Sequence, residues 1–357
     1  MKPDTVTFNS VLLAFANSRS EAAALKAEQI LQGMIKISDS SVNPNVTSYT
    51  TVISAWAKSR SEKALKRVEK ILLGMEDSKY VQPNTVTYAT VLNAFAQSDN
   101  PSSVDLAMRI LQRMEEGNAK ARPNAYCYGS AMDCISKFAE KDSIFTQAEP
   151  LLRRMIDNQQ SQNHEGDENK NKPESYTVVF NTALKAIQKS PVMRKDEVAT
   201  KFMDLMMEVN SNTTNQTIRA HPSTQTYSLF IRACAFVKGG PSEKKAAFHK
   251  AMDALQDLRR SDRLRPDTYT YPAIFRAGEE LLDTSSSSED LELIRNLFTM
   301  CCEDGLVSDL LLNNMKNFLP KDFLSLLWNT ENDPSKVNVR DLPAEWRKHR
   351  NQTNKQR

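Results

Sequence analysis

The sequence has little of what most enzymes need at an active site. Nine glycines in 357 residues leave no glycine-rich phosphate loop, and four scattered histidines fit neither a zinc site nor a catalytic triad. The pairing of H-x-E with C-x-x-C that marks a zinc deaminase is also missing. We therefore expect no catalytic residue, no metal site and no cofactor, and we predict that the chain is not an enzyme. A catalytic domain outside the given residues stays open as an alternative.

Other features are scarce as well. The five cysteines form an odd set without a CxxC spacing, so we interpret them as reduced, small hydrophobic residues in helices. No stretch approaches the roughly 18 apolar residues of a membrane span, so we expect no membrane partner. The N-terminus shows no targeting segment and begins inside a repeat at Pro3, so we expect an upstream portion to be missing. A net charge of +3 is too slight to indicate a nucleic-acid partner by itself.

What the sequence does contain is a repeat of sixteen residues. PNVTSYTTVISAWAKS (44–59) and PNTVTYATVLNAFAQS (83–98) are identical at eight of sixteen positions, and PDTVTFNSVLLAFANS (3–18) is a third copy. Further copies are more degenerate, and each is anchored by a proline. The anchoring residues are Pro3, Pro44, Pro83, Pro123, Pro173, Pro222 and Pro266. Internal repetition at this period is typical of solenoid proteins.

Each copy predicts two helices. The first helix carries an aromatic residue five positions after the proline, and apolar residues follow at offsets that share one helical face. The aromatic residues are Phe8, Tyr49, Tyr88, Tyr128, Tyr227 and Tyr271, with Phe180 two positions late in the fifth copy. The second helix carries the series Ile30-Leu31-Met34, Ile71-Leu72-Met75, Ile110-Leu111-Met114 and Leu151-Leu152-Met155. These spacings again mark one apolar stripe.

A single pair of helices is too small to bury its own stripe, so neighbouring pairs must stack into an all-α solenoid. We expect a repeat array over 1–309, with units starting near residues 3, 44, 83, 123, 173, 222 and 266 and polar insertions at 157–172 and 210–221. Residues 310–330 are expected to form C-terminal capping helices. Residues 331–357 are expected to be a basic, flexible tail, which either touches RNA or keeps the chain soluble.

The pattern P-[DN]-x-x-[TS]-[YF] at the start of the first helix, with A..IL..M in the second, resembles the pentatricopeptide repeat. The units are similar to the P class, although they are longer and partly degenerate. The resemblance implies a right-handed α-solenoid of about seven helix-turn-helix repeats, in which each repeat reads one RNA base with two or three side chains. It also implies that the groove lined by the first helices holds the RNA.

The resemblance assigns roles to particular residues. The base-reading residues would be Asn9, Asn45, Thr50, Asn84, Asn124, Asn181, Ser223, Ser228 and Asp267. The residues that stack on a base face would be Val6, Thr47, Val86 and Val178, with Tyr126, Gln225 and Tyr269 at the same repeat position. The lysines directed at phosphate would be Lys58, Lys137 and Lys189. The pairs Gly129/Glu174 and Pro272/Asp309 would complete the series without a full set of side-chain hydrogen bonds.

Simpler interpretations exist for the same residues. Asn45, Asn84, Asn124 and Asp267 stand where a helix needs an N-terminal cap, and the lysines stand at solvated helix ends. For function, we expect a monomeric, sequence-selective, single-stranded RNA-binding protein of a mitochondrion or plastid, acting in RNA processing, stability or translation. The alternative is a scaffold that binds a helix or peptide of a protein partner in the same groove.

Overall fold

The computed structural model describes residues 3–37, 40–117, 121–138, 143–162, 174–189, 194–211, 218–285, 287–330 and 333–349. These residues form helical hairpins, so the predicted all-α repeat fold is confirmed. The first helices of the hairpins are α1 (Thr5–Asn17), α3 (Val46–Ser59), α5 (Thr85–Gln97), α7 (Ala125–Phe138), α9 (Thr177–Lys189), α11 (Thr224–Ala235), α13 (Thr270–Leu281) and α15 (Asp309–Phe318). The second helices are α2 (Glu21–Lys36), α4 (Ala64–Glu76), α6 (Ser103–Glu116), α8 (Ser143–Gln162), α10 (Lys195–Ser211), α12 (Pro241–Arg260), α14 (Ser288–Glu303) and α16 (Lys321–Trp328). None of these helices has the length and apolar character needed to cross a membrane.

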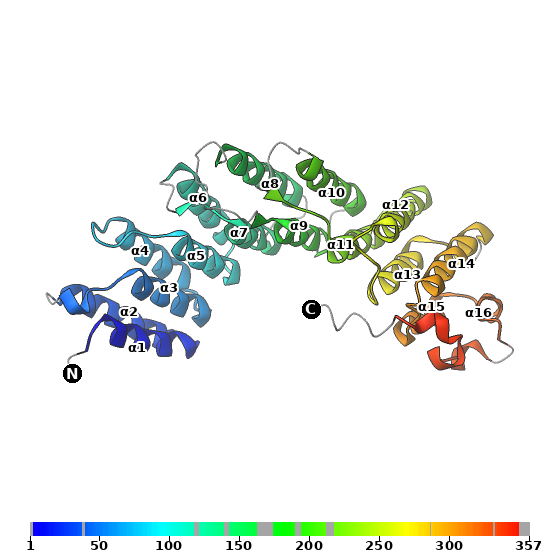
Figure 1. Cartoon of the computed structure of the whole chain (residues 1–357), viewed down its shortest axis with the longest axis horizontal. Helices are drawn as coiled ribbons and strands as arrows, with labels where there is room; N and C mark the ends of the chain where they lie inside the picture. The colour runs from blue at the N-terminus through cyan, green and yellow to red at the C-terminus, as the bar shows by residue number, and fades with distance from the viewer. Residues whose placement is uncertain are drawn as a thin grey trace. The chain divides into compact units, whose positions relative to one another are not determined.

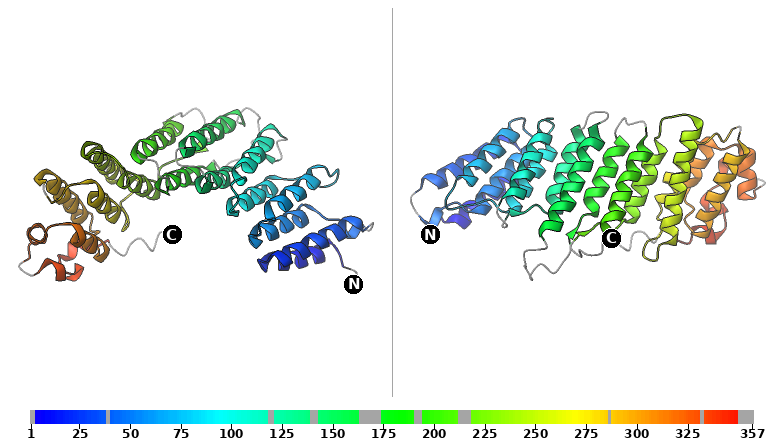
Figure 2. Two further views of the ribbon diagram at one scale, coloured as in Figure 1. Left: turned by 180° about the vertical axis from the view of Figure 1, so that it is seen from behind. Right: turned by 90° about the horizontal axis from the view of Figure 1, so that it is seen from above.

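The chain divides into two compact units. One consists of Met1–Ala186 with Thr214–Arg219, and the other of Ile187–Thr213 with Ala220–Arg357. The first unit holds α1 to α8 and most of α9, and the second holds α10 to α16. Figure 1 shows the hairpins of each unit, and Figure 2 shows them from two further sides.

Within the first unit, each first helix packs on the first helix of the next hairpin: α1 on α3, α3 on α5, and α5 on α7 (Figure 1). The second helices α2, α4 and α6 each contact the first helix of their own hairpin and that of the next, as α2 does with α1 and α3. The shared core contains Trp56 and Phe95, which are fully buried. Burial of a side chain of this size contributes about 2–3 kcal/mol, so the repeated stripe holds the stack together.

The first unit also contains a short parallel pairing. Strands β1 (Glu174–Ser175) and β2 (Ile218–Arg219) pair, and the Tyr176 N–H donates to the Arg219 carbonyl oxygen over 2.8 Å. The expectation that 210–221 is a polar insertion is therefore wrong for residues 210–211, which end α10, and for β2. Residues 157–162 of the other expected insertion continue α8, because the helix extends beyond its apolar stripe. Ala220 is also described and is fully buried. Residues 163–172, Pro173 and 212–217 lie outside the described residues.

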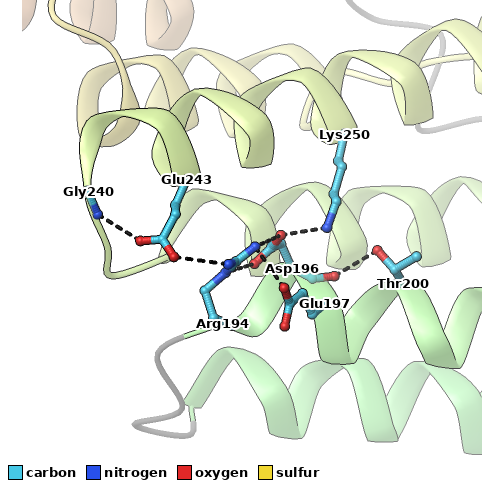
Figure 3. Close-up of polar contacts among 7 residues, drawn as sticks. All are labelled: Arg194, Asp196, Glu197, Thr200, Gly240, Glu243 and Lys250. Atoms are coloured by element: carbon cyan, nitrogen blue, oxygen red, sulfur yellow. Dashed lines mark hydrogen bonds and ion pairs between the residues drawn. The ribbon is translucent and has the colours of Figure 1, made fainter.

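In the second unit, α11 packs on α12 and α13, and α13 packs on α15. A charged cluster joins α10 to α12 around the fully buried carboxylate of Asp196 (Figure 3). Lys250 Nζ lies 2.6 Å from one carboxylate oxygen, and Arg194 donates to both oxygens over 3.2 Å. Burial raises the pKa of Asp196, but the hydrogen bonds from Arg194 and Lys250 outweigh that effect and hold the pKa below its usual value.

The segment after α16 is folded where it is described. Residues 333–349 form three 3-10 helices, η3 (Pro334–Lys336), η4 (Val339–Asp341) and η5 (Ala344–Arg347). Val337, Val339 and Leu342 are buried, and the Trp346 ring meets the Phe298 ring of α14 edge-on at 5.7 Å. The expectation of a flexible tail is therefore wrong for residues 333–349, because several of their apolar side chains join the core. Residues 350–357 lie outside the described residues.

Candidate functional site

The second residue of each first helix other than α13 is exposed, as is Tyr269 directly before α13, and most of these residues are apolar. In the first unit these residues are Val6, Thr47, Val86, Tyr126 and Val178, and in the second unit they are Gln225, Tyr269 and Leu310. Val6 is 70% exposed, Val86 63% and Val178 64%, whereas the other described Val side chains, apart from Val11, are buried or half-buried. We call these eight residues the exposed row. Repeated exposure of apolar side chains at one structural position indicates a contact surface.

A polar residue caps the start of several first helices: Asp4, Asn45, Asn84, Ser223 and Ser308 each accept a hydrogen bond from the N–H of the third helical residue. Asn45 accepts hydrogen bonds from the Ser48 N–H (3.1 Å) and the Ser48 hydroxyl (3.2 Å), and the Ser48 hydroxyl accepts in turn from the Asn45 N–H. The same arrangement surrounds Asn84 and Thr87, where the Thr87 N–H donates over 3.0 Å. The capping roles use the Oδ1 atoms of these asparagines and leave their amide N–H groups for other partners. Capping and recognition are thus compatible in one side chain.

The sequence-predicted base-reading residues of the first hairpins meet at these caps. Asn9 Nδ2 donates to Asn45 Oδ1 over 3.3 Å, and the Ser48 hydroxyl donates to Asn9 Oδ1 over 2.7 Å. Thr50 and Asn84 do not touch directly. The Thr50 hydroxyl lies 3.2 Å from the Thr87 hydroxyl, which donates to Asn84 Oδ1 over 3.1 Å. Each pair therefore combines one residue of a first helix with the cap of the next hairpin.

The other predicted residues are less regular. Asn124 accepts from the Cys127 N–H over 3.1 Å, and Ser223 caps α11 by accepting from the Thr226 N–H. Asp267 accepts from the N–H of Thr270, the first residue of α13, whose cap position falls on Tyr269. The Ser228 hydroxyl is buried without a hydrogen-bond partner, and Asn181 is only 9% exposed. Asn181 and Ser223 belong to different units, so the structure does not place this pair relative to one another.

Two of the pairs in the degenerate copies need correction. Glu174 lies in β1, because α9 starts at Thr177 and its cap position falls on Tyr176 rather than on the residue after Pro173. The cap of α15 is Ser308, which accepts from the Leu311 N–H over 3.3 Å, so Asp309 is already the first residue of the helix. In both copies the helix starts at a different distance from the proline position of the repeat than it does in the first three copies.

The lysines predicted for phosphate contacts stand at the far ends of the first helices. Lys58 donates to Asn17 over 3.3 Å, and Lys137 donates to the Ser98 carbonyl and pairs with Asp99, each over 2.6 Å. The hydrogen bond from Lys137 lowers the pKa of Asp99. Eleven residues of helix separate Lys58 from Thr47 of the exposed row, which corresponds to about 16 Å. The side chain of Lys189 lies outside the described residues.

The carboxylates between consecutive hairpins are residues that the sequence patterns did not reveal. Glu28, Glu76 and Glu115 each accept from an aromatic side chain and from an arginine of the next hairpin. For two of these glutamates the sequence holds a signal that could have revealed them: Glu76 and Glu115 directly follow Met75 and Met114 of the repeated apolar series. Among the described residues, no group of three or more His, Cys, Asp and Glu side chains is placed to hold a metal ion.

Comparison with protein families agrees with the repeat geometry. A family model described as a pentatricopeptide repeat domain matches residues 30–98 and, in an overlapping placement, residues 70–137. Residues 30–137 belong to the pentatricopeptide repeat family. The matched residues hold α3 to α6 and parts of α2 and α7, where the helix starts and caps are most regular.

Solved structures of pentatricopeptide repeat proteins are similar at a low level. Two crystal structures of PPR10 in complex with an 18-nucleotide psaJ RNA element share 15% identity with this chain, and one of PPR10 from maize shares 16%. Each covers 91% of this chain, with TM-scores of 0.35, 0.35 and 0.36. This chain spans a little under half of those chains, 45% to 48%. Scores at this level carry no argument about function. No curated protein matches the sequence.

Proposed function

We propose that this chain binds single-stranded RNA, with one nucleotide at each well-formed hairpin. In each such site the exposed-row side chain covers a base face. The residue three positions further along the helix and the cap of the next hairpin contact the base edge. Asn9/Asn45 and Thr50/Asn84 are the pairs with the full set of polar groups.

The observation that carries this proposal is the combination of exposure and regularity in the first unit. Val6, Thr47 and Val86 stand at one position of three successive first helices, and the caps of the hairpins that follow, Asn45, Asn84 and Asn124, accept the capping bond through Oδ1. A flat apolar contact beside hydrogen-bonding groups suits a nucleobase, because every base has an apolar face and a polar edge. Stacking of one base on a side chain contributes about 1–3 kcal/mol, so several hairpins together give a useful affinity.

Titration of fluorescently labelled, random-sequence single-stranded RNA at low salt tests the proposal. The substitution Val86→Asp places a negative charge against the base and should weaken binding about tenfold or more. Leu73→Asp is the matched control, because Leu73 is 45% exposed on a second helix and outside the exposed row. Absence of RNA binding, or equal weakening by both variants, would contradict the proposal.

The pairs themselves are tested by Asn9→Ala, Thr50→Ala and Asn84→Ala. We expect each to change which nucleotides are enriched when bound RNA is selected from a random pool and sequenced. Asn84→Ala also removes a helix cap and is expected to cost about 1 kcal/mol of stability, so its binding must be measured where the variant is fully folded. If the variants enrich the same nucleotides as the unaltered chain, these residues do not select the base. The proposal would then be reduced to RNA binding without sequence selectivity.

The wider role follows the family resemblance. We propose a non-catalytic protein of a mitochondrion or plastid that acts on the processing, stability or translation of an organellar transcript. Crosslinking in cells, followed by sequencing of the bound RNA, tests this directly. Recovery of nuclear-encoded transcripts alone would overturn the organellar assignment.

A protein-binding scaffold is the second candidate. It is favoured by the slight net charge of +3 and by the ion pair of Lys137 with Asp99, which neutralises one of the lysines predicted for phosphate contacts. RNA binding draws much of its affinity from phosphate contacts and falls steeply with salt. An affinity for RNA that is weak and insensitive to salt would therefore favour the scaffold.

A further inference from the structure

Lys195, the first residue of α10, is a buried cation without an acidic partner. It is only 8% exposed, and its Nζ donates to the Gln188 carbonyl oxygen at the end of α9 over 2.8 Å. None of the described carboxylates forms an ion pair with it. Lysine is almost never buried unless it is paired, and its ammonium has three donors. The carbonyl uses one donor, so two remain for another acceptor.

The carboxylates around Lys195 are engaged by other cations. Asp196, the next residue, lies between Arg194 and Lys250 (Figure 3). Glu243 of α12 pairs with Arg194 over 3.2 Å. These contacts compensate the charges of Arg194 and Lys250. They leave the charge of Lys195 without compensation.

Phe236, directly after α11, brings a second cation to the same place. Lys195 Nζ lies 5.4 Å from the centre of its ring, and Arg276 Cζ lies 5.5 Å from it. Arg276 is exposed on α13, which packs on α11. The face of an aromatic ring attracts a cation, but the ring has no net charge and neutralises neither of them.

Lys238 adds a third positive charge from the turn between α11 and α12, where it is exposed. Burial lowers the pKa of Lys195, and the nearby charge of Lys238 lowers it further. Neither Lys238 nor Arg276 forms an ion pair within the described residues. The two glutamates at 279–280 follow Arg276 on α13 without pairing with it. Three cations from three elements of the second unit thus surround one ring.

We propose that Lys195, Lys238 and Arg276 bind a phosphate group beside Phe236. A phosphate offers several acceptor oxygens and more negative charge than a carboxylate, so it suits two ammonium groups and a guanidinium. Phe236 stands at the repeat position of Lys58, so the cations of this site come from other positions of the repeat. The inference does not depend on the proposed RNA binding, because the phosphate can belong to an RNA backbone or be free in solution.

Thermal melting in inorganic phosphate, compared with chloride at equal ionic strength, tests the site on the whole chain. Phosphate should raise the melting temperature of the unaltered chain by about 2–4 °C more than that of Lys238→Gln or Arg276→Gln. Lys70→Gln is the matched control, since Lys70 is exposed on α4. This control and the charge-keeping Arg276→Lys should respond like the unaltered chain. An equal response of every variant would be an unspecific salt effect and would overturn the site.

The salt dependence of RNA binding separates the two sources of phosphate. Each contact to single-stranded RNA adds about 0.7 to the slope of the logarithm of affinity against that of salt concentration. If the site holds an RNA phosphate, Lys238→Gln and Arg276→Gln should lower this slope by about that amount, while Lys70→Gln should not. An unchanged slope together with the melting response would assign the site to free phosphate.

The two proposals fail in different ways. RNA binding with neither the change in slope nor the specific melting response would overturn the phosphate site and leave the proposed function standing. A specific melting response in a chain that binds no RNA would overturn the proposed function and leave the phosphate site standing. Circular dichroism of each variant establishes that it is folded before either comparison is made.

Discussion

The hydroxyl of Tyr88 on α5 donates a 2.8 Å hydrogen bond to the carboxylate of Glu76 on α4, the second helix of the preceding hairpin. Arg113 of the following second helix contacts the same carboxylate over 3.0 Å. The same contact of an aromatic residue, a glutamate and an arginine occurs one hairpin later with Tyr128, Glu115 and Arg154. It also occurs one hairpin earlier with Trp56, Glu28 and Arg67. A carboxylate between two donors of the next hairpin fixes the register of the stack.

Removal of the hydroxyl in Tyr88→Phe leaves the Glu76 carboxylate with one donor fewer in a partly buried site. We expect the free energy of unfolding to fall by about 1–2 kcal/mol, measured by urea denaturation. Burial and the carboxylate both raise the pKa of Tyr88, so the hydroxyl remains a donor at any ordinary pH. Tyr80→Phe is the control, because Tyr80 is 95% exposed, and it should leave the midpoint unchanged. An equal effect of both variants would show that the hydrogen bond is not the cause.

Asp196 should make the second unit sensitive to acid. Its pKa in the folded chain is below the usual value of 3.8, so its carboxylate stabilises the fold fully above that pH. The contribution is lost as the pH falls from about 3.8 through the lower pKa of the folded state. We expect Asp196→Asn to be less stable at pH 7, by about 1–3 kcal/mol, and to lose less further stability between pH 5 and pH 2.

The control for this pH profile is Asp253→Asn, since Asp253 lies exposed on α12. Urea midpoints across the pH range give the comparison. Parallel profiles for the unaltered chain and Asp196→Asn would show that another group governs the acid response.

Gly305 should tolerate no side chain. Its φ angle is +66°, and an added Cβ would lie 2.8 Å from Lys348 Cγ and 3.2 Å from the Glu345 carbonyl oxygen. Gly305→Ala is expected to cost about 1–2 kcal/mol and to loosen the contact of Trp346 with Phe298, which tryptophan fluorescence reports. Gly33→Ala is the matched control: no atom lies within 4 Å of its added Cβ, and alanine favours helix α2. A loss of stability in Gly33→Ala instead of a gain of about 0.5–1 kcal/mol would contradict this reasoning.

The cysteines should be chemically inert in the folded chain. Burial raises the pKa of Cys134, Cys234 and Cys302 to about 12, so at pH 8 roughly one thiol in ten thousand is ionised. We expect iodoacetamide at pH 8 to label the native chain very slowly and all five cysteines rapidly in urea. Fast labelling of Cys134 or Cys234 without denaturant would mean that the helices around it open readily.

Much of the fold could be predicted from short-range patterns. The offset of aromatic and apolar residues predicted the first helices, and Phe180 was recognised as the late aromatic of α9. The predicted caps Asn45 and Asn84 do cap α3 and α5. The folded segment around Val339 was not predicted, because three buried side chains in a polar stretch give no periodic signal. The pairing of Glu76 with Tyr88 was missed for another reason: its partners come from different hairpins, and no single helix pattern joins them.

The sequence by itself determined the helices, their apolar stripes and the residues that start them, because these depend on neighbours within a few positions of the chain. Only the tertiary structure decided that Val86 remains exposed while Val91, five residues away, is fully buried. It also decided that Asn9 meets Asn45, and that the segment around Val339 contacts α15. These outcomes depend on contacts between residues that lie more than twenty positions apart in the chain. Such contacts exist only once the hairpins have stacked.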